Sequence, residues 1–474
     1  MNLKYIFTLF IFVTSILSAQ NNIKGANFDF DKTFEKHPQI VLADNYNHYL
    51  FTLTNRDGMQ TNHKLTLRKF DQKNQLVDTY VKDFAIDMFT LHNFHGVYEI
   101  DNSKIAFIIE SYSNKRKINE LFKYVFDKNT GQFTSSVLSS NVTSEDKKFG
   151  YYNVAKSQNN KFIGISYEPK SKKKEPEVTD CLVLNSTTFE EVFKKTVQFE
   201  DEFYTDEKLI SNNGNYIFLR RPKSYKETNY FVVISKETEA KKTIEENTKV
   251  HKPVAISIGN QDYLLAFNYR DKGIRRGDFG SVLLYDVAAG KILKNNEIED
   301  FNKTKDIQEV YLRNIFVENN EIRVFVEGKY KSGTKPSETF PNSKMTDPVY
   351  NFGPSNLLIF SLDGTLTKNI SLEINNQSEP DMYRSFGLLN IKGEYIIHTG
   401  TYYKGNYLHN WLYKINPNNN YSFSNYNYRY HIADSVSYKF VNQIVHYFPD
   451  TNRVLVAVVV TNENKMGLLS FTLE

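Results

Sequence analysis

The chain has 474 residues, of which 24% are charged, 40% hydrophobic and 15% aromatic, and its formal net charge is +4. This balance is typical of a folded globular protein, so it excludes a disordered chain, a collagen and a protein that crosses a membrane many times. A charge so small on so long a chain also argues against a dedicated nucleic-acid-binding protein.

The first residues have the pattern of a secretory signal peptide. A basic residue, Lys4, precedes the apolar run 5–17, and small residues follow up to Ala19. The apolar run is shorter than the roughly 20 residues that span a bilayer, and no cysteine follows it to carry a lipid. We therefore expect cleavage after Ala19. The mature chain would begin at Gln20, contain no transmembrane segment and be exported to the periplasm or the extracellular space.

Cys181 is the one cysteine of the chain. A single thiol forms no intramolecular disulfide and cannot build a cysteine-based zinc site. The residues that follow it, Leu182, Val183 and Leu184, are apolar. We therefore expect a buried thiol with a structural role.

Two apolar runs separated by a tight polar turn recur eight times along the chain. The last apolar residue before each turn marks the repeat: Phe70, Phe126, Leu184, Ile234, Tyr285, Phe360, Ile415 and Phe471. The intervals are about 50 to 58 residues, apart from a longer one between Tyr285 and Phe360. Upstream of each marker lies another apolar run, after turns such as Asn213-Gly214, Asn319-Asn320 and Lys392-Gly393, which suit tight hairpins.

With one more strand ahead of each turn, every repeat has four strands, here called A to D in chain order. Four-stranded units repeated along a chain are typical of β-propeller blades, and one such unit cannot bury both of its faces alone. We therefore predict an all-β fold with a single β-propeller domain at residues 20–474. Eight blades are favoured, and seven blades are the alternative.

The two ends of the chain predict how the propeller is closed. The eighth repeat ends at Glu474, immediately after its third strand. The segment 22–30 lies ahead of the first full repeat and could supply the missing strand. Pairing of the N- and C-terminal strands would then close the ring and cover the open edges that a linear array exposes. The alternative is that this segment is an unpaired tail.

The long interval between two repeats contains a stretch rich in glycine, proline and serine at residues 331–356. Its prolines are Pro336, Pro341, Pro348 and Pro354. Because proline has no amide hydrogen to donate to a strand ladder, we predict an inserted loop here.

Loops that would share one face of the propeller differ in charge. The B–C loops are basic with interleaved tyrosines, whereas the D–A loops are acidic. Opposite charges in neighbouring loops could simply pair at the surface and contribute little, which is the interpretation we favour. Alternatively, the basic loops could bind an anionic polymer. The candidate ligand-binding residues are Tyr269, Arg270, Lys272, Arg275, Arg276, Arg220 and Arg221.

His92 and His95 are the only close pair of histidines. On a strand, residues three apart point to opposite faces, so the two rings would not share a metal ion unless the strand bends. We predict no metal site and no cofactor. The chain has no P-loop, G-x-S-x-G or H-E-x-x-H motif, and its catalytic residues, if there are any, stay unknown.

These patterns favour an exported binding or scaffold β-propeller that recognises a macromolecule, either a protein or an anionic glycan, through loops on one face. The alternative is a glycan-processing enzyme such as an acidic-polysaccharide lyase, in which arginine neutralises a uronate and tyrosine or histidine transfers protons. We favour the non-enzymatic function and expect a monomer.

Overall fold

The computed structural model describes residues 23–31, 35–54, 63–84, 90–113, 115–142, 150–169, 176–199, 203–222, 229–244, 248, 250–269, 279–298, 307–336, 344–372, 374, 376–377, 386–400, 407–431, 438–460 and 463–473. Within these ranges, no helix is long and apolar enough to cross a membrane. The predicted signal peptide lies outside them.

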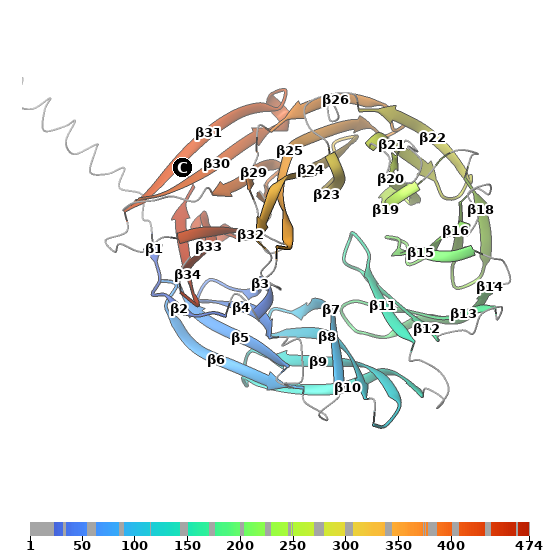
Figure 1. Cartoon of the computed structure of the whole chain (residues 1–474), viewed down its shortest axis with the longest axis horizontal. Coiled ribbons are helices and arrows are strands. Elements are labelled where there is room, and N and C mark those ends of the chain that lie inside the picture. Colours follow the sequence, from blue (N-terminus) through green and yellow to red (C-terminus); the bar gives the residue numbers. More distant parts are fainter. Residues whose placement is uncertain are drawn as a thin grey trace, which may run out of the picture. The chain divides into compact units, whose positions relative to one another are not determined.

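The described chain is nearly all strand and has a β-propeller fold of eight four-stranded antiparallel sheets (Figure 1). Each sheet is a blade, and blades 1 to 8 follow one another along the chain. The predicted fold class is therefore confirmed, with eight blades rather than seven. Contacts divide the chain into two compact units. The prediction of a single domain stays a prediction.

The first unit contains blades 1, 7 and 8. Blade 1 consists of β3 (Glu35–Ala43), β4 (Asn47–Thr54), β5 (Lys64–Asp71) and β6 (Leu76–Asp83). Blade 7 consists of β28 (Gly387–Ile391), β29 (Glu394–Gly400), β30 (Tyr407–Asn416) and β31 (Ser422–His431), with the 3-10 helix η2 (Pro417–Asn419) between the last two. Blade 8 consists of β32 (Tyr438–Phe448), η3 (Pro449–Thr451), β33 (Arg453–Val460) and β34 (Lys465–Thr472), joined by β1 (Ile23–Lys24) and β2 (Phe28–Asp29).

The second unit contains blades 2 to 6. Blade 2 consists of β7 (Thr90–Asp101), β8 (Lys104–Ser113), β9 (Ile118–Asp127) and β10 (Gln132–Val142), and blade 3 of β11 (Tyr151–Lys156), β12 (Phe162–Glu168), β13 (Glu177–Asn185) and β14 (Glu191–Phe199). Blade 4 consists of β15 (Phe203–Ile210), β16 (Tyr216–Pro222), β17 (Tyr230–Ile234) and β18 (Glu239–Thr243), and blade 5 of β19 (Val250–Ile258), β20 (Gln261–Tyr269), β21 (Phe279–Asp286) and β22 (Lys291–Glu297). Blade 6 consists of β23 (Ile307–Glu318), β24 (Glu321–Pro336), β25 (Thr346–Ser361) and β26 (Leu366–Ser371), with the short β27 (Asn376–Gln377) beside β25.

The core lies between the faces of consecutive blades. In the second unit, one cluster joins blades 5 and 6 through residues such as Phe267 and Val324, and another joins blades 3 and 4 through Val183 and Phe218. The middle strands have both faces covered, which explains their continuous apolar runs. Cys181 belongs to the cluster between blades 3 and 4, so the expectation of a buried thiol is confirmed.

The tight A–B turns have the backbone conformations that their sequences predict. Positive φ angles occur at Gly214, Asn319, Asn320, Lys392 and Gly393. Glycine and asparagine tolerate this region better than other residues do, so these positions can end one strand and start the next within two to five residues.

The N-terminal segment pairs with the last strand of the chain. In antiparallel register, Ile23 faces Ser470 and Phe28 faces Met466. Phe28 and Phe30 are buried in the cluster between blades 8 and 1. The predicted pairing of the two termini is therefore confirmed, and the segment is not a free tail.

The segment predicted as an inserted loop at 331–356 extends a hairpin instead. β24 and β25 stay paired from Glu321 and Ser361 out to Pro336 and Thr346. The inference that its prolines exclude a ladder was wrong for a physical reason. Pro336 ends its strand, and Pro354 lies at a register shift. Pro348 lies on β25 outside the stretches that pair with β26 and β27, so the strand has one free edge there and needs no second ladder bond. Pro341 lies outside the described residues.

Candidate functional site

The two edges of blades 1 to 7 differ in their connections. At what we call the turn edge, strands A and B are joined by short turns such as 102–103 in blade 2 and 319–320 in blade 6. At the opposite loop edge, where strand A begins and strand B ends, the connections are longer, as at 270–278 and 337–345. Loops on a rigid frame are the usual place for binding residues, so the loop edge is where a functional site is expected.

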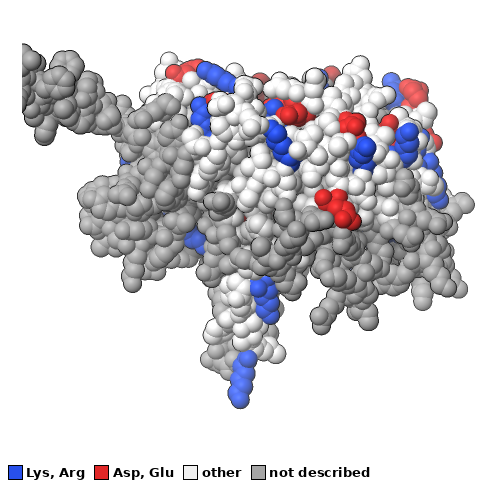
Figure 2. All heavy atoms as spheres, turned by 90° about the horizontal axis from the view of Figure 1, so that it is seen from above, with Lys and Arg blue, Asp and Glu red and all other residues white. Residues whose placement is uncertain are grey.

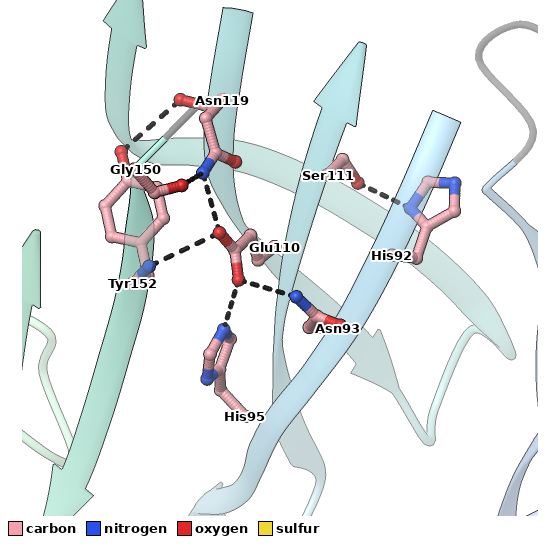
Figure 3. Close-up of polar contacts among 8 residues, drawn as sticks. All are labelled: His92, Asn93, His95, Glu110, Ser111, Asn119, Gly150 and Tyr152. Carbon is pink, nitrogen blue, oxygen red and sulfur yellow. Dashed lines mark hydrogen bonds and ion pairs between the residues drawn. The ribbon is translucent and has the colours of Figure 1, made fainter. Parts of the chain in front are cut away.

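A buried carboxylate near the loop edge of blade 2 organises a dense polar cluster. Glu110 on β8 is 3% exposed and accepts four hydrogen bonds (Figure 3). Its Oε1 accepts from Asn119 Nδ2 at 2.7 Å and from the Tyr152 amide at 3.3 Å. Its Oε2 accepts from Asn93 Nδ2 and His95 Nε2, both at 3.0 Å.

The cluster joins two blades. Asn93 lies opposite Glu110 on β7, and Asn119 comes from β9 of the same blade. Asn119 Nδ2 also donates to the Gly150 carbonyl at 3.0 Å, and Gly150 directly precedes β11 of blade 3. The carboxylate therefore holds the first strand of blade 3 against the middle of blade 2.

A β-bulge brings His95 to the carboxylate. The register of β7 against β8 shifts between Phe94 and Gly96, so His95 is the extra residue of the bulge. Bulges re-aim a side chain without ending the sheet. With this one, Asn93 and His95 both reach the same Glu110 oxygen (Figure 3).

The hydrogen bonds define the charge state of the cluster. Burial by itself disfavours the charged form of Glu110, but the hydrogen bonds from His95, Asn93 and Asn119 outweigh it and lower the pKa of the carboxyl. Because an ionised carboxylate only accepts, His95 Nε2 carries the proton. In a neutral imidazole, Nδ1 is then an acceptor, and this atom has no hydrogen-bond partner among the described residues. The Nδ1 atom of His95 is therefore available as a hydrogen-bond acceptor.

His92 belongs to a separate contact on the other face of the strand. Its Nδ1 lies 2.7 Å from Ser111 Oγ, and its ring contacts those of His63 and Phe84 (Figure 3). The two histidines thus have different partners, as expected for residues three apart on a strand. No group of three or more His, Cys, Asp or Glu side chains in the described ranges could hold a metal ion.

Two of the predicted ligand-binding residues are engaged within the fold. The Arg220 side chain is fully buried. Its Nη1 donates hydrogen bonds to Glu177 Oε2 and Thr205 Oγ1, each at 2.6 Å. Its guanidinium lies 3.9 Å from the centre of the Phe199 ring. Arg221 Nη2 donates to the Val250 carbonyl at 2.9 Å.

The acidic partner of Arg221 is Asp206, whose Oδ2 lies 2.7 Å from Arg221 Nε. Both arginines therefore tie neighbouring strands and blades together. Of the other predicted residues, Tyr269 is the last residue of β20. Arg270, Lys272, Arg275 and Arg276 lie outside the described residues.

No protein-family model matches the chain, and no curated protein matches it. Among solved structures, the β-propeller domain of the Trilobed protease from Pyrococcus furiosus is 9% identical, with 86% of this chain and 97% of that chain covered and a TM-score of 0.38. The WD40 domain of SCAP from fission yeast is 8% identical, with 95% and 94% covered and a TM-score of 0.42. A Synechocystis apocarotenoid oxygenase is 10% identical, with 56% and 62% covered and a TM-score of 0.33. Identities this low bear on no function, and the fold assignment here rests on the strand pairing itself.

Sequence reasoning singled out His95 but missed its partners. A signal was present, because Glu110 directly follows the apolar run Ile105–Ile109 within one strand. A carboxylate placed inside a buried strand must find hydrogen-bond donors. Asn119 and Tyr152 could not be found in this way, since their contact depends on the packing of blade 3 against blade 2.

Proposed function

We propose that this chain is an exported, non-enzymatic recognition protein that binds an anionic macromolecule through the loop edge, with the β24–β25 hairpin as its main contact. The ligand would be an anionic glycan or an acidic protein surface. Export is proposed from the signal-peptide pattern of residues 1–19 alone.

The supporting observation is the distribution of unpaired basic charge. Among the described basic side chains of blades 3 and 4, Arg220 pairs with Glu177 and Lys208 pairs with Glu168. On the hairpin, Lys331 and Lys344 are exposed and have no acidic partner among the described residues. Figure 2 shows a narrow projection that carries blue side chains, in keeping with this extended hairpin.

The hairpin is also firmly anchored at its base. Phe352 on β25 is buried opposite Lys329, next to the residue at which β24 stops pairing with β23. The short strand β27 adds a further partner beside Asn351 and Phe352. An element held in one conformation loses little entropy on binding, which favours affinity. Cationic side chains on such an element would attract polyanions at moderate ionic strength.

The test is retention on immobilised acidic polysaccharides and acidic proteins. The double variant Lys331→Glu/Lys344→Glu should bind at least about tenfold more weakly than the natural protein, because four units of charge change at the contact. The matched control is Lys194→Glu/Lys291→Glu, which changes two exposed lysines on the outer strands β14 and β22. Equal retention of the hairpin variant and the natural protein would refute the proposal.

A second candidate function, glycan processing, is favoured by one observation. The Glu110–His95 pair orients an imidazole whose Nδ1 can accept a proton, as a general base requires. The measurement is release of unsaturated or reducing-end products from the same polysaccharides. Activity that His95→Gln abolishes, while binding is retained, would replace recognition by catalysis as the function.

A further inference from the structure

The outermost strand of blade 2 differs from the other outer strands. β10 pairs with β9 on one side and is the last strand of its sheet. At 11 residues it is the longest of the outer strands, which include β6, β14, β18, β22, β26 and β31. Among these outer strands, its free edge therefore presents the longest row of backbone amide and carbonyl groups without a strand partner in the described sheets.

β10 also has few of the features that usually protect the edge of a sheet from pairing with another strand. Its sequence, Gln-Phe-Thr-Ser-Ser-Val-Leu-Ser-Ser-Asn-Val, contains no charged residue and no proline. The other full-length outer strands each carry at least one charge, for example Lys241 and Lys242 on β18 or Lys194 and Lys195 on β14. Charged side chains, proline and bulges are the devices that keep sheet edges from pairing. β10 has one of them, a register shift between Val137 and Ser139.

We propose that β10 pairs antiparallel with β10 of a second copy of the chain, so that the two blade 2 sheets become one continuous sheet. The register shift limits the regular part of the edge to the stretch Gln132–Val137, which is about 20 Å long. Within it, Thr134, Ser135, Ser136 and Val137 are all exposed, and Val137 retains 48% of its surface.

The composition of the strand favours a second copy as the occupant. Two-fold antiparallel pairing sets a strand against its own copy, so charges near the centre of the pairing meet like charges, which is destabilising. β10 contains no charge, so every cross-strand pair is uncharged in every register. The same pairing of β18, centred between Lys241 and Lys242, would bring four lysines together. Hydroxyl and β-branched side chains such as Thr134 and Val137 form favourable cross-strand pairs.

The contact is small compared with obligate interfaces, so we infer a weak dimer that forms at high protein concentration. This proposal differs from the monomer expected from the sequence, which stays a prediction. The inference does not rest on the proposed function, because neither Lys331 nor Lys344 belongs to blade 2.

The test is sedimentation velocity of the purified protein from about 1 to 200 µM, a range chosen for weak self-association. The natural protein should shift from monomer to dimer within this range. The variant Thr134→Lys/Ser136→Lys should stay monomeric, because two-fold pairing would set its lysines close together. The control Val77→Lys/Thr79→Lys changes two exposed residues with the same spacing on β6 and should dimerise like the natural protein.

A second measurement locates the contact. Ser135→Cys should form a disulfide-linked dimer on mild oxidation, whereas the natural protein should not, since Cys181 is buried. A natural protein that is monomeric at every concentration would overturn the inference. So would a dimer that survives the lysine substitutions on β10.

Discussion

At the scale of single residues, Glu110 is the most demanding position of blade 2. Removing it leaves His95, Asn93 and Asn119 without their common acceptor. Replacing one partner of a buried charged network costs about 3–5 kcal/mol. We expect Glu110→Ala to lower the free energy of unfolding by that amount in urea titration. Glu191→Ala, at an exposed end of β14, should change it by less than about 0.5 kcal/mol. Similar losses in both variants would mean that the network adds no specific stability.

His48 gives the fold a pH dependence. Burial, followed by the charges of Arg453 and His446, lowers the pKa of His48 to about 3. Its ring lies stacked on that of Phe70. The folded state keeps this imidazole neutral, whereas the unfolded chain protonates it below about pH 6.5. The unfolded state thus binds more protons, and stability falls as the pH drops from about 6.5 towards 3.

The variant His48→Phe should remove this part of the pH dependence while keeping an aromatic ring against Phe70. At pH 5, the natural protein should lose about 2 kcal/mol at this position relative to pH 7.5, because each pKa unit is worth about 1.4 kcal/mol. Thermal unfolding of both proteins at the two pH values measures the difference. Identical pH dependence of the melting temperatures would show that His48 is not the titrating group.

At the scale of elements, the N-terminal strands stabilise the blade that they complete. Deleting residues 20–31 removes the pairs to β34 and the buried rings of Phe28 and Phe30. Burial of two such side chains is worth about 3–6 kcal/mol. We expect a clearly lower melting temperature, read by differential scanning fluorimetry. A melting curve like that of the full protein would mean that the pairing contributes little.

A single substitution tests the same element without shortening the chain. A Cβ atom at Gly25 would lie 1.9 Å from the carbonyl oxygen of Asn74, which is impossible without movement of the backbone. Gly25→Ala should therefore destabilise the protein, whereas Gly333→Ala, where a Cβ atom meets nothing within 4 Å, should not.

The strands were predictable from the sequence to different degrees. The period of the repeat located the B and C strands, because these are buried on both faces and read as apolar runs such as Val454–Val460. The β24–β25 hairpin was not predictable in the same way. Proline excludes a central strand, but the extended part of this hairpin has a free edge, and a missing amide there removes no ladder bond. The tight turns at Asn319 and Gly393 could be predicted from the sequence, since a positive φ angle depends on the local residue type.

At the scale of the whole molecule, the candidate site could be predicted only in part from the sequence, because it joins neighbouring blades. The sequence places His95 on a strand, and nothing in it shows that Tyr152, in the next repeat, meets Glu110. The same holds for Arg220. A basic residue after an apolar strand was interpreted as part of a ligand surface, whereas Glu177 from the preceding blade neutralises it. Charge patterns along a chain predict surfaces poorly when blades are held together by buried ion pairs.

Cys181 reports on whether neighbouring blades separate. Burial raises the pKa of its thiol to about 12, and the side chain lies among the core residues of blades 3 and 4. The thiolate is the reactive form, so a thiol reagent should label the native protein very slowly at pH 8 and the urea-unfolded protein within minutes.

If Lys208→Ala or Glu177→Ala weakens the contacts between these blades, labelling of the folded protein should accelerate, because opening exposes the thiol. The control, Lys194→Ala on the exposed edge of β14, should leave the rate unchanged. Rapid labelling of the natural protein under native conditions would contradict a tightly packed contact between blades 3 and 4.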